Sequence, residues 1–164
     1  MSPEDLVLTP TGVRFLGRRF PCVIGRGGLT ADKREGDMAT PRGTWHITDM
    51  LYRPDRIAAP APWARPIRVG DLWSDDAGDV HYNQPVRRPY KFSHEALRRA
   101  DPLYDLVLVS DWNTDPAAPG RGSAIFLHQW RRPGYPTAGC IAFARRDLRV
   151  IAEAIRPGTR VLVR

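Results

Sequence analysis

The sequence predicts a mainly β, single-domain protein that spans residues 1–164. Three observations support this prediction. Sixteen prolines and fourteen glycines in 164 residues favour many turns over long helices. The apolar segments are short, or their apolar residues alternate with polar ones. No shift in composition, internal repeat or low-complexity run divides the chain, so one domain is expected.

Seven segments have the length and apolar character of strands. The clearest is residues 44–52, where Trp45, Ile47 and Leu51 recur with the two-residue period of a half-buried strand. The predicted strands lie within residues 7–8, 12–16, 20–24, 44–52, 106–110, 124–128 and 160–163.

Two segments are predicted to be helical. Residues 145–155 place Leu148, Ile151, Ala152 and Ile155 on one helical face, and a Pro-Gly pair follows. Residues 94–100 form a shorter candidate, with Ser93 in the position of an N-cap. The sequence therefore predicts a short helix before the later core strands and a second helix near the C-terminus.

The net charge of +7 comes mainly from arginine. The basic residues occur singly or in pairs, without a run of five, and no nucleic-acid motif accompanies them. A nucleic-acid-binding domain is thus the weakest of the functional classes considered. A basic surface favours substrates that carry carboxylates, since the arginine fork binds a carboxylate through two hydrogen bonds.

The N-terminal residues predict the location of the protein, and the histidines and cysteines predict whether it binds a metal. The first five residues are acidic and no apolar stretch of seven or more follows, so we expect no membrane segment and a cytoplasmic location. A leader outside this sequence would instead make the protein periplasmic. The four histidines show no metal-ligand spacing and there is no Cys-x-x-Cys motif, so neither a metal nor another cofactor is expected.

Cys140 and His128 are the candidate catalytic residues. Cys140 follows Gly139 in a turn-rich loop that leads into the predicted helix, and His128 ends an apolar run. A thiol is nucleophilic as the thiolate, and an imidazole or a helix N-terminus lowers its pKa. A buried, inert cysteine and a core histidine are the simpler alternative. We expect Cys140 to be the reactive thiol, and Cys22 to be a buried strand residue.

Three blocks of sequence resemble the L,D-transpeptidase (YkuD-domain) family. They are Gly139-Cys140-Ile141 after Thr137, with His128 upstream, together with residues 121–128 and residues 25–44. The resemblance extends from about residue 25 to the C-terminus. Two positions depart from the family pattern, because Ala138 replaces a frequent histidine and Ala142 replaces a frequent arginine. The spacing from histidine to cysteine is also shorter than in the crosslinking members.

The resemblance implies a β-sandwich or barrel and cysteine-dependent acyl transfer on L,D-peptide bonds of peptidoglycan stem peptides. Cys140 would be the nucleophile, His128 the general base and acid, and the backbone around Gly139 the oxyanion site. Carbapenem-type β-lactams would acylate Cys140, and no cofactor is required. The candidate substrate-binding residues are Thr137, Arg121, Arg131, Tyr82 and Asn113.

Release of the acyl group to water, as in an L,D-carboxypeptidase that removes terminal D-Ala, is the expected outcome. Crosslinking to an amine acceptor is the alternative within the family, and a non-catalytic muropeptide-binding module is the alternative of another class. The charged residues within 30–43 are expected to shape a loop rather than to take part in chemistry.

Overall fold

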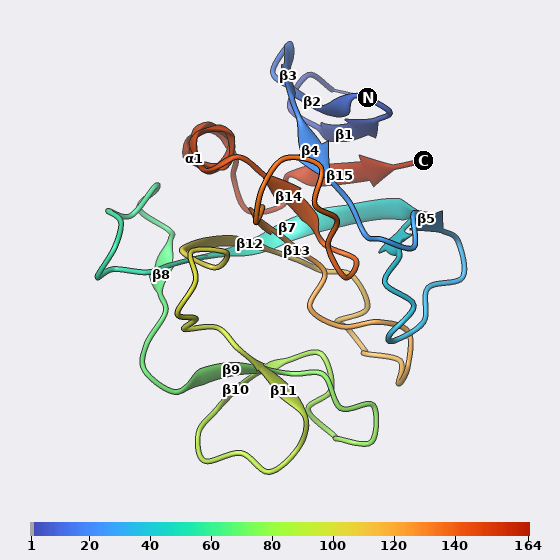
Figure 1. Cartoon of the computed structure of the whole chain (residues 1–164), viewed down its shortest axis with the longest axis vertical. Helices are drawn as coiled ribbons and strands as arrows, with labels where there is room; N and C mark the ends of the chain where they lie inside the picture. Colours follow the sequence, from blue (N-terminus) through green and yellow to red (C-terminus); the bar gives the residue numbers. More distant parts are fainter. Residues whose placement is uncertain (1) are drawn as a thin grey trace.

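A computed structural model describes residues 2–164 and shows a protein built mainly from strands (Figure 1). Ten of the strands within these residues form one sheet. They are β1 (Leu6–Thr9), β2 (Gly12–Phe15), β3 (Arg18–Phe20), β4 (Cys22–Val23), β7 (Gly43–Tyr52), β8 (Arg65–Pro66), β12 (Leu106–Ser110), β13 (Phe126–Gln129), β14 (Ile141–Phe143) and β15 (Arg160–Val163).

The main sheet has the order β3-β2-β1-β15-β7-β12-β13-β14-β4, and β8 pairs with β7 beside this path. Its two end regions approach each other where β4 contacts β2, so the sheet is nearly closed in the manner of a barrel. β1 pairs in parallel with β15, which brings the two ends of the chain together (Figure 1). Each of the seven predicted strand segments contains a strand, and the predicted fold class is confirmed.

The remaining elements are two small sheets and one helix within residues 2–164. β9 (Asp71–Ser74), β10 (Pro85–Arg87) and β11 (His94–Ala96) form a three-stranded sheet at the opposite end of the molecule from β1–β3 (Figure 1). β5 (Leu29–Thr30) and β6 (Thr40–Pro41) form a parallel pair. The helix α1 is Arg145–Ala154, close to the prediction. It buries Leu148, Ile151 and Ala152.

The predicted helix over residues 94–100 is wrong. Residues 94–96 instead form β11, which pairs with β9 so that Glu95 lies opposite Trp73. The apolar positions in this stretch are few, and ladder hydrogen bonds to β9 satisfy its backbone where a lone short helix would be marginal. Tertiary pairing therefore overrides the local helical pattern.

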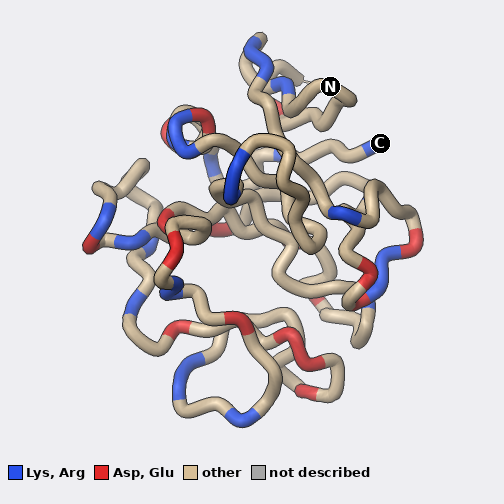
Figure 2. Tube along the Cα trace, viewed as in Figure 1, with Lys and Arg blue, Asp and Glu red and all other residues tan. Residues whose placement is uncertain are grey.

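Side-chain alternation divides the core into two parts, one on each face of β12 and β13. Leu106, Leu108 and Leu127 pack on the face covered by α1. Val107 and Phe126 pack on the other face, together with residues from the three-stranded sheet and its connections. No helix within residues 2–164 has both the length and the apolar character to cross a membrane. Lysines and arginines are scattered along the trace (Figure 2).

Candidate active site

Cys140 and His128 lie on the same face of neighbouring strands. β13 and β14 pair in parallel, with Leu127 opposite Ile141 and His128 opposite Ala142. Because side chains alternate along a strand, this register puts Cys140 on the His128 face, at the entrance to β14. Both residues line a cavity of about 260 Å³. The structure thus brings the predicted pair to one cavity, although no hydrogen bond joins the two side chains within residues 2–164.

The His128 ring is oriented by the main chain. Its Nδ1–H donates a hydrogen bond of 2.7 Å to the carbonyl oxygen of Gln129, and the ring centroid lies 5.2 Å from that of Tyr104. This bond leaves Nε2 as the unprotonated acceptor of a neutral ring. Burial lowers the pKa of His128 to about 4. The ring is therefore neutral at pH 7 and can accept a proton.

The Cys140 thiol is buried and protonated in the resting site. It donates a hydrogen bond of 3.1 Å to the carbonyl oxygen of Ala124. Burial raises the pKa of Cys140 to about 12, and the charge of Glu95 acts in the same direction. The expectation of a lowered pKa is therefore wrong. Strand β14 separates Cys140 from the start of α1, so the helix N-terminus does not adjoin the thiol, and desolvation dominates.

Gly139 has a backbone that only glycine adopts readily. Its φ is +138°, and a Cβ at this position would lie 2.9 Å from the carbonyl oxygen of Ala39. The Gly139 carbonyl accepts a hydrogen bond of 2.7 Å from Thr40 Oγ1. The loop before Cys140 is thus packed directly against the segment that contains Ala39 and Thr40.

Thr137 fixes the turn that presents Cys140. Its hydroxyl donates to the Cys140 carbonyl oxygen at 2.6 Å and accepts from the Gly139 N–H at 3.1 Å. The Gly139 N–H expected to serve the oxyanion is therefore already engaged. The Cys140 N–H has no hydrogen-bond partner in the part of the chain that the structure describes.

The charged segment before β6 is a structural support. Lys33 is buried and pairs with Asp37, and its Nζ also donates 2.8 Å to the Arg34 carbonyl oxygen. Glu35 accepts a hydrogen bond of 2.8 Å from Ser123 Oγ. These contacts fold the segment against the loops beside Cys140, as expected from the sequence.

The L,D-transpeptidase catalytic-domain (YkuD) family model matches residues 8–163. This chain belongs to the L,D-transpeptidase family. The protein is accordingly an enzyme of this family, which acts on peptidoglycan peptides. Comparisons with curated proteins and with solved structures gave no match.

Ala142, which stands where the family pattern often has an arginine, lies in the core of the fold. Ala142 is fully buried and lies opposite His128 in the ladder between β13 and β14. Basic groups near Cys140 come instead from Arg26 and Arg131, both of which line the cavity. Arg131 also lies over the Tyr135 ring, 5.4 Å from its centroid. This member of the L,D-transpeptidase family therefore carries the basic groups of its cavity on loops.

An acidic residue that the sequence did not reveal lines the same cavity. Glu95 accepts a hydrogen bond of 2.7 Å from the Tyr104 hydroxyl. Burial raises the pKa of Glu95. The incorrect helix prediction concealed this residue, because it gave no reason to place Glu95 beside Cys140. The cavity thus combines Arg26 and Arg131 with one carboxyl group.

Three predicted substrate-binding residues lie outside this cavity. Arg121 forms an ion pair of 2.6 Å with Asp32. Tyr82 is buried and donates to Glu35. Asn113 donates 2.9 Å to the Gly122 carbonyl oxygen as part of a turn. The structure therefore brings only Thr137 and Arg131, of the five candidates, to the cavity that contains Cys140.

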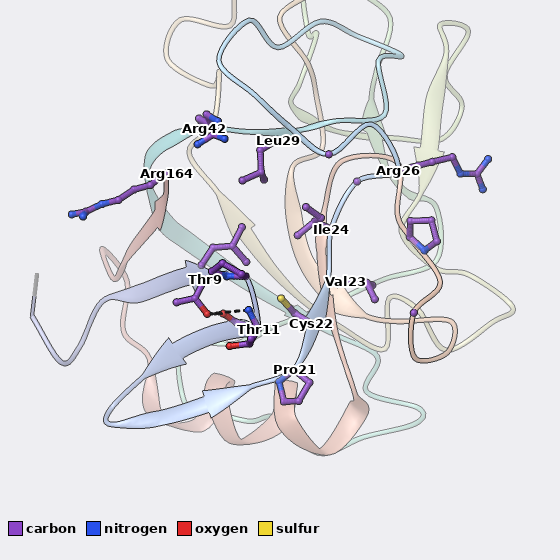
Figure 3. A pocket seen from close by; sticks show the side chains of 17 residues that line it. Thr9, Thr11, Pro21, Cys22, Val23, Ile24, Arg26, Leu29, Arg42 and Arg164 are labelled. Atoms are coloured by element: carbon purple, nitrogen blue, oxygen red, sulfur yellow. Dashed lines mark hydrogen bonds between the residues drawn. The ribbon is translucent and has the colours of Figure 1, made fainter.

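Cys22 lines a different and larger cavity, of about 770 Å³ (Figure 3). It lies in β4 and is half-buried rather than buried, which corrects the expectation from sequence. Burial still raises the pKa of Cys22 to about 11. Arg26 and Pro136 line both cavities, so the two are neighbours.

Residues 2–164 contain no group of three His, Cys, Asp or Glu side chains arranged to hold a metal ion. His46 is instead paired with Asp111, with 2.8 Å between Nδ1 and Oδ2. That the enzyme needs no cofactor stays a prediction.

Proposed function

We propose that this enzyme is an L,D-carboxypeptidase that removes terminal D-Ala from peptidoglycan stem peptides. The observation that carries the proposal is the joint lining of one small cavity by Cys140, His128, Arg26 and Arg131. A thiol nucleophile and a neutral imidazole supply the acyl-transfer chemistry. The two arginines supply binding groups for the free carboxylate that distinguishes a chain end from an internal peptide bond.

The reaction would start from a neutral thiol and a neutral imidazole. His128 Nε2 takes the Cys140 proton as Sγ bonds to the carbonyl carbon of the L-centre, and the carbonyl electron pair moves to oxygen. Collapse of this intermediate breaks the C–N bond, and the imidazolium returns the proton to the departing D-Ala amine. Water, deprotonated by His128, then cleaves the thioester and restores the thiol.

The free N–H of Cys140 supports oxyanion binding. A single donor of this kind typically contributes about 3 kcal/mol to transition-state stabilisation. Because the thiol pKa is about 12, a preformed thiolate would be scarce at pH 7. Proton transfer concerted with attack avoids that charged intermediate in a buried site.

The surroundings of the cavity favour water over an amine as the acceptor. The neighbouring cavity is lined by Arg26, Arg42 and Arg164, and by no Asp or Glu of the described residues. A positively charged wall repels an ammonium group and lowers its local concentration. Crosslinking remains the alternative, and a muropeptide-binding module without catalysis is disfavoured by the presence of both Cys140 and His128.

Product analysis by mass spectrometry tests the proposal. Purified protein is incubated with a tetrapeptide muropeptide, with and without an excess of an amine acceptor, and Cys140→Ala serves as the matched control. We expect the tripeptide and free D-Ala in both reactions, and neither with the variant. Crosslinked dimer as the main product would establish the transpeptidase alternative, and no product with any stem peptide would favour the binding module.

Covalent inhibition provides a second test. Carbapenems present a strained amide carbonyl to the same thiol, so we expect a single adduct in the intact mass of the wild type and none with Cys140→Ala. An adduct that persists in Cys140→Ala and is absent from Cys22→Ala would transfer the nucleophile to Cys22.

The location of the enzyme follows from the proposed reaction and is also a proposal. Trimming of D-Ala suits soluble muropeptides recovered from the wall, which supports a cytoplasmic enzyme. Fractionation of cells that produce the full-length protein from its own gene tests this. Recovery in the periplasm would contradict it and favour crosslinking.

A further inference from the structure

The start of α1 forms one wall of a cavity that shares no lining residue with the Cys140 cavity. This cavity, of about 520 Å³, is lined by Arg145, Arg146 and Arg149 of α1, and by Arg56 from the segment after β7. No Asp or Glu of the described residues lines it. Four guanidinium groups around one hollow attract anions, most strongly where no carboxylate partner offsets the charge.

Two of these arginines have no partner within residues 2–164. Arg56 pairs with Asp105 at 2.8 Å, and Arg149 pairs with Glu153 at 2.6 Å. Arg145 and Arg146 are exposed and form neither an ion pair nor a side-chain hydrogen bond with the described residues. Their charges are therefore available to a ligand.

The position of Arg145 and Arg146 is unfavourable for the helix itself. A helix N-terminus carries a partial positive charge, so basic side chains in the first turn are destabilising there. The N-cap residue is Ala144, which provides no side-chain hydrogen bond to the free N–H groups. Asp147 is the one acidic residue of this first turn. A bound anion would add to its effect by satisfying the free N–H groups and neutralising the two arginines together.

Gln129 adds an independent observation. It is only 5% exposed, and it lines this cavity. Its side-chain amide has no hydrogen-bond partner among the described residues. Neither amide atom is among the fully buried polar atoms that lack a partner, so the amide reaches the open space of the cavity and is available to a polar ligand. Alternation along β13 puts this side chain on the α1 face, opposite to that of His128.

The floor of the cavity is apolar, because Ile57, Ala58 and Leu106 line it. A volume of about 520 Å³ exceeds the needs of a bare phosphate and lies within the range of sites for small organic ligands. We propose that this cavity binds a phosphate-bearing small molecule with an apolar or aromatic body. The phosphate would lie at the start of α1 between Arg145 and Arg146, with Gln129 donating or accepting a hydrogen bond. This inference does not depend on the proposed catalytic function.

Calorimetric titration with ADP, pyrophosphate and adenosine tests the site. We expect the wild type to bind ADP more tightly than pyrophosphate and to bind adenosine weakly. The double variant Arg145→Gln/Arg146→Gln should weaken ADP binding at least about tenfold, because two charge-assisted contacts are lost. Gln129→Met keeps the size of the side chain and should weaken binding about fivefold, as expected for one lost neutral hydrogen bond.

The matched control removes two positive charges elsewhere. Arg14 and Arg68 are exposed and have no side-chain ion pair within residues 2–164, so Arg14→Gln/Arg68→Gln has the same net charge as the test variant. Its ADP affinity should stay within about twofold of the wild type, since screening weakens distant charges. Equal loss in both double variants would reduce the effect to net charge and overturn the site. Equal affinity for ADP and pyrophosphate would overturn the role of the apolar floor.

Thermal unfolding separates binding from damage to the fold. Without ligand, Arg145→Gln/Arg146→Gln should melt at the same temperature as the wild type or higher, because the opposing charges at the helix start are gone. ADP should raise the Tm of the wild type and leave that of the double variant unchanged. A lower Tm of the unliganded double variant, or no binding of ADP by the wild type, would overturn the proposal.

Discussion

Cys140 and Cys22 have similar resting acidity but very different surroundings. Burial raises the pKa of both thiols, to about 12 and about 11 respectively. Only Cys140 shares a cavity with an imidazole, that of His128. The loop before Cys140 is also held in place, by hydrogen bonds from the Thr137 and Thr40 hydroxyls. Cys22 lies in β4, on the wall of a cavity without a histidine among its described lining residues. The neighbouring base and the loop geometry, rather than a low resting pKa, therefore distinguish the candidate nucleophile.

Removal of each sulfur should produce the largest contrast. Cys140→Ala should lower turnover in the proposed carboxypeptidase reaction by about four orders of magnitude or more, since loss of a nucleophile removes the covalent route. Cys22→Ala should change turnover less than about twofold, since no reacting group touches it. Steady-state release of D-Ala measures both. Comparable losses of turnover in the two variants would contradict the assignment of Cys140, rather than Cys22, as the nucleophile.

The imidazole should be the next largest contribution. His128→Ala is expected to reduce turnover by about two to four orders of magnitude, the usual effect of losing a general base. The controls His46→Ala, His81→Ala and His94→Ala change histidines that do not line the Cys140 cavity, and they should act only through stability. Near-normal activity of a folded His128→Ala protein would show that His128 is not the general base for Cys140.

The neutral state of His128 predicts how stability depends on pH. Its folded pKa of about 4 is below the unfolded value of 6.5. The unfolded chain therefore binds the proton first as the pH falls. The contribution of neutral His128 to the free energy of unfolding is therefore complete above about pH 6.5 and is lost as the pH falls towards 4. The loss amounts to about 3 kcal/mol. Denaturant unfolding at several pH values measures this, and His128→Gln should show a flatter profile by that amount. Parallel profiles would mean that His128 is solvated.

The loop geometry that Cys22 lacks is tested by Gly139→Ala. The positive φ and the close Ala39 carbonyl should together reduce the free energy of unfolding by about 2 kcal/mol or more. Gly134→Ala is the matched control, because Gly134 also has a positive φ, of 73°, but its added Cβ would meet no atom within 4 Å. A loss of about 1 kcal/mol is expected there. Equal losses would show that the Ala39 contact relaxes freely.

Alkylation should give the smallest difference between the two cysteines. Here Cys22, rather than Cys140, should react faster. At pH 8 iodoacetamide should label Cys22 faster than Cys140, since the Cys22 side chain is more exposed and burial raises the pKa of Cys140 further. Peptide mapping over time measures the ratio. Faster labelling of Cys140 would mean that His128 lowers the thiol pKa in solution, as the sequence alone had suggested.

Most of the strand framework was predictable because apolar alternation reports burial on one face directly. The segments around Trp45 and Leu108 became β7 and β12, and the amphipathic spacing of Leu148 and Ile151 became α1. Residues 94–96 were not predictable, since a three-residue strand has too little pattern of its own and depends on β9 for its hydrogen bonds.

The family and the candidate catalytic pair, Cys140 and His128, follow from local sequence, through Gly139-Cys140-Ile141 and the blocks upstream of it. The protonation of that pair depends on the folded environment, because the pKa of a thiol or imidazole changes with how much water the fold removes from it. Tertiary structure also decided which charges line the cavity. Glu95, Arg26 and Arg131 come from distant segments, and long-range packing, which has no local signature, brings them to one place.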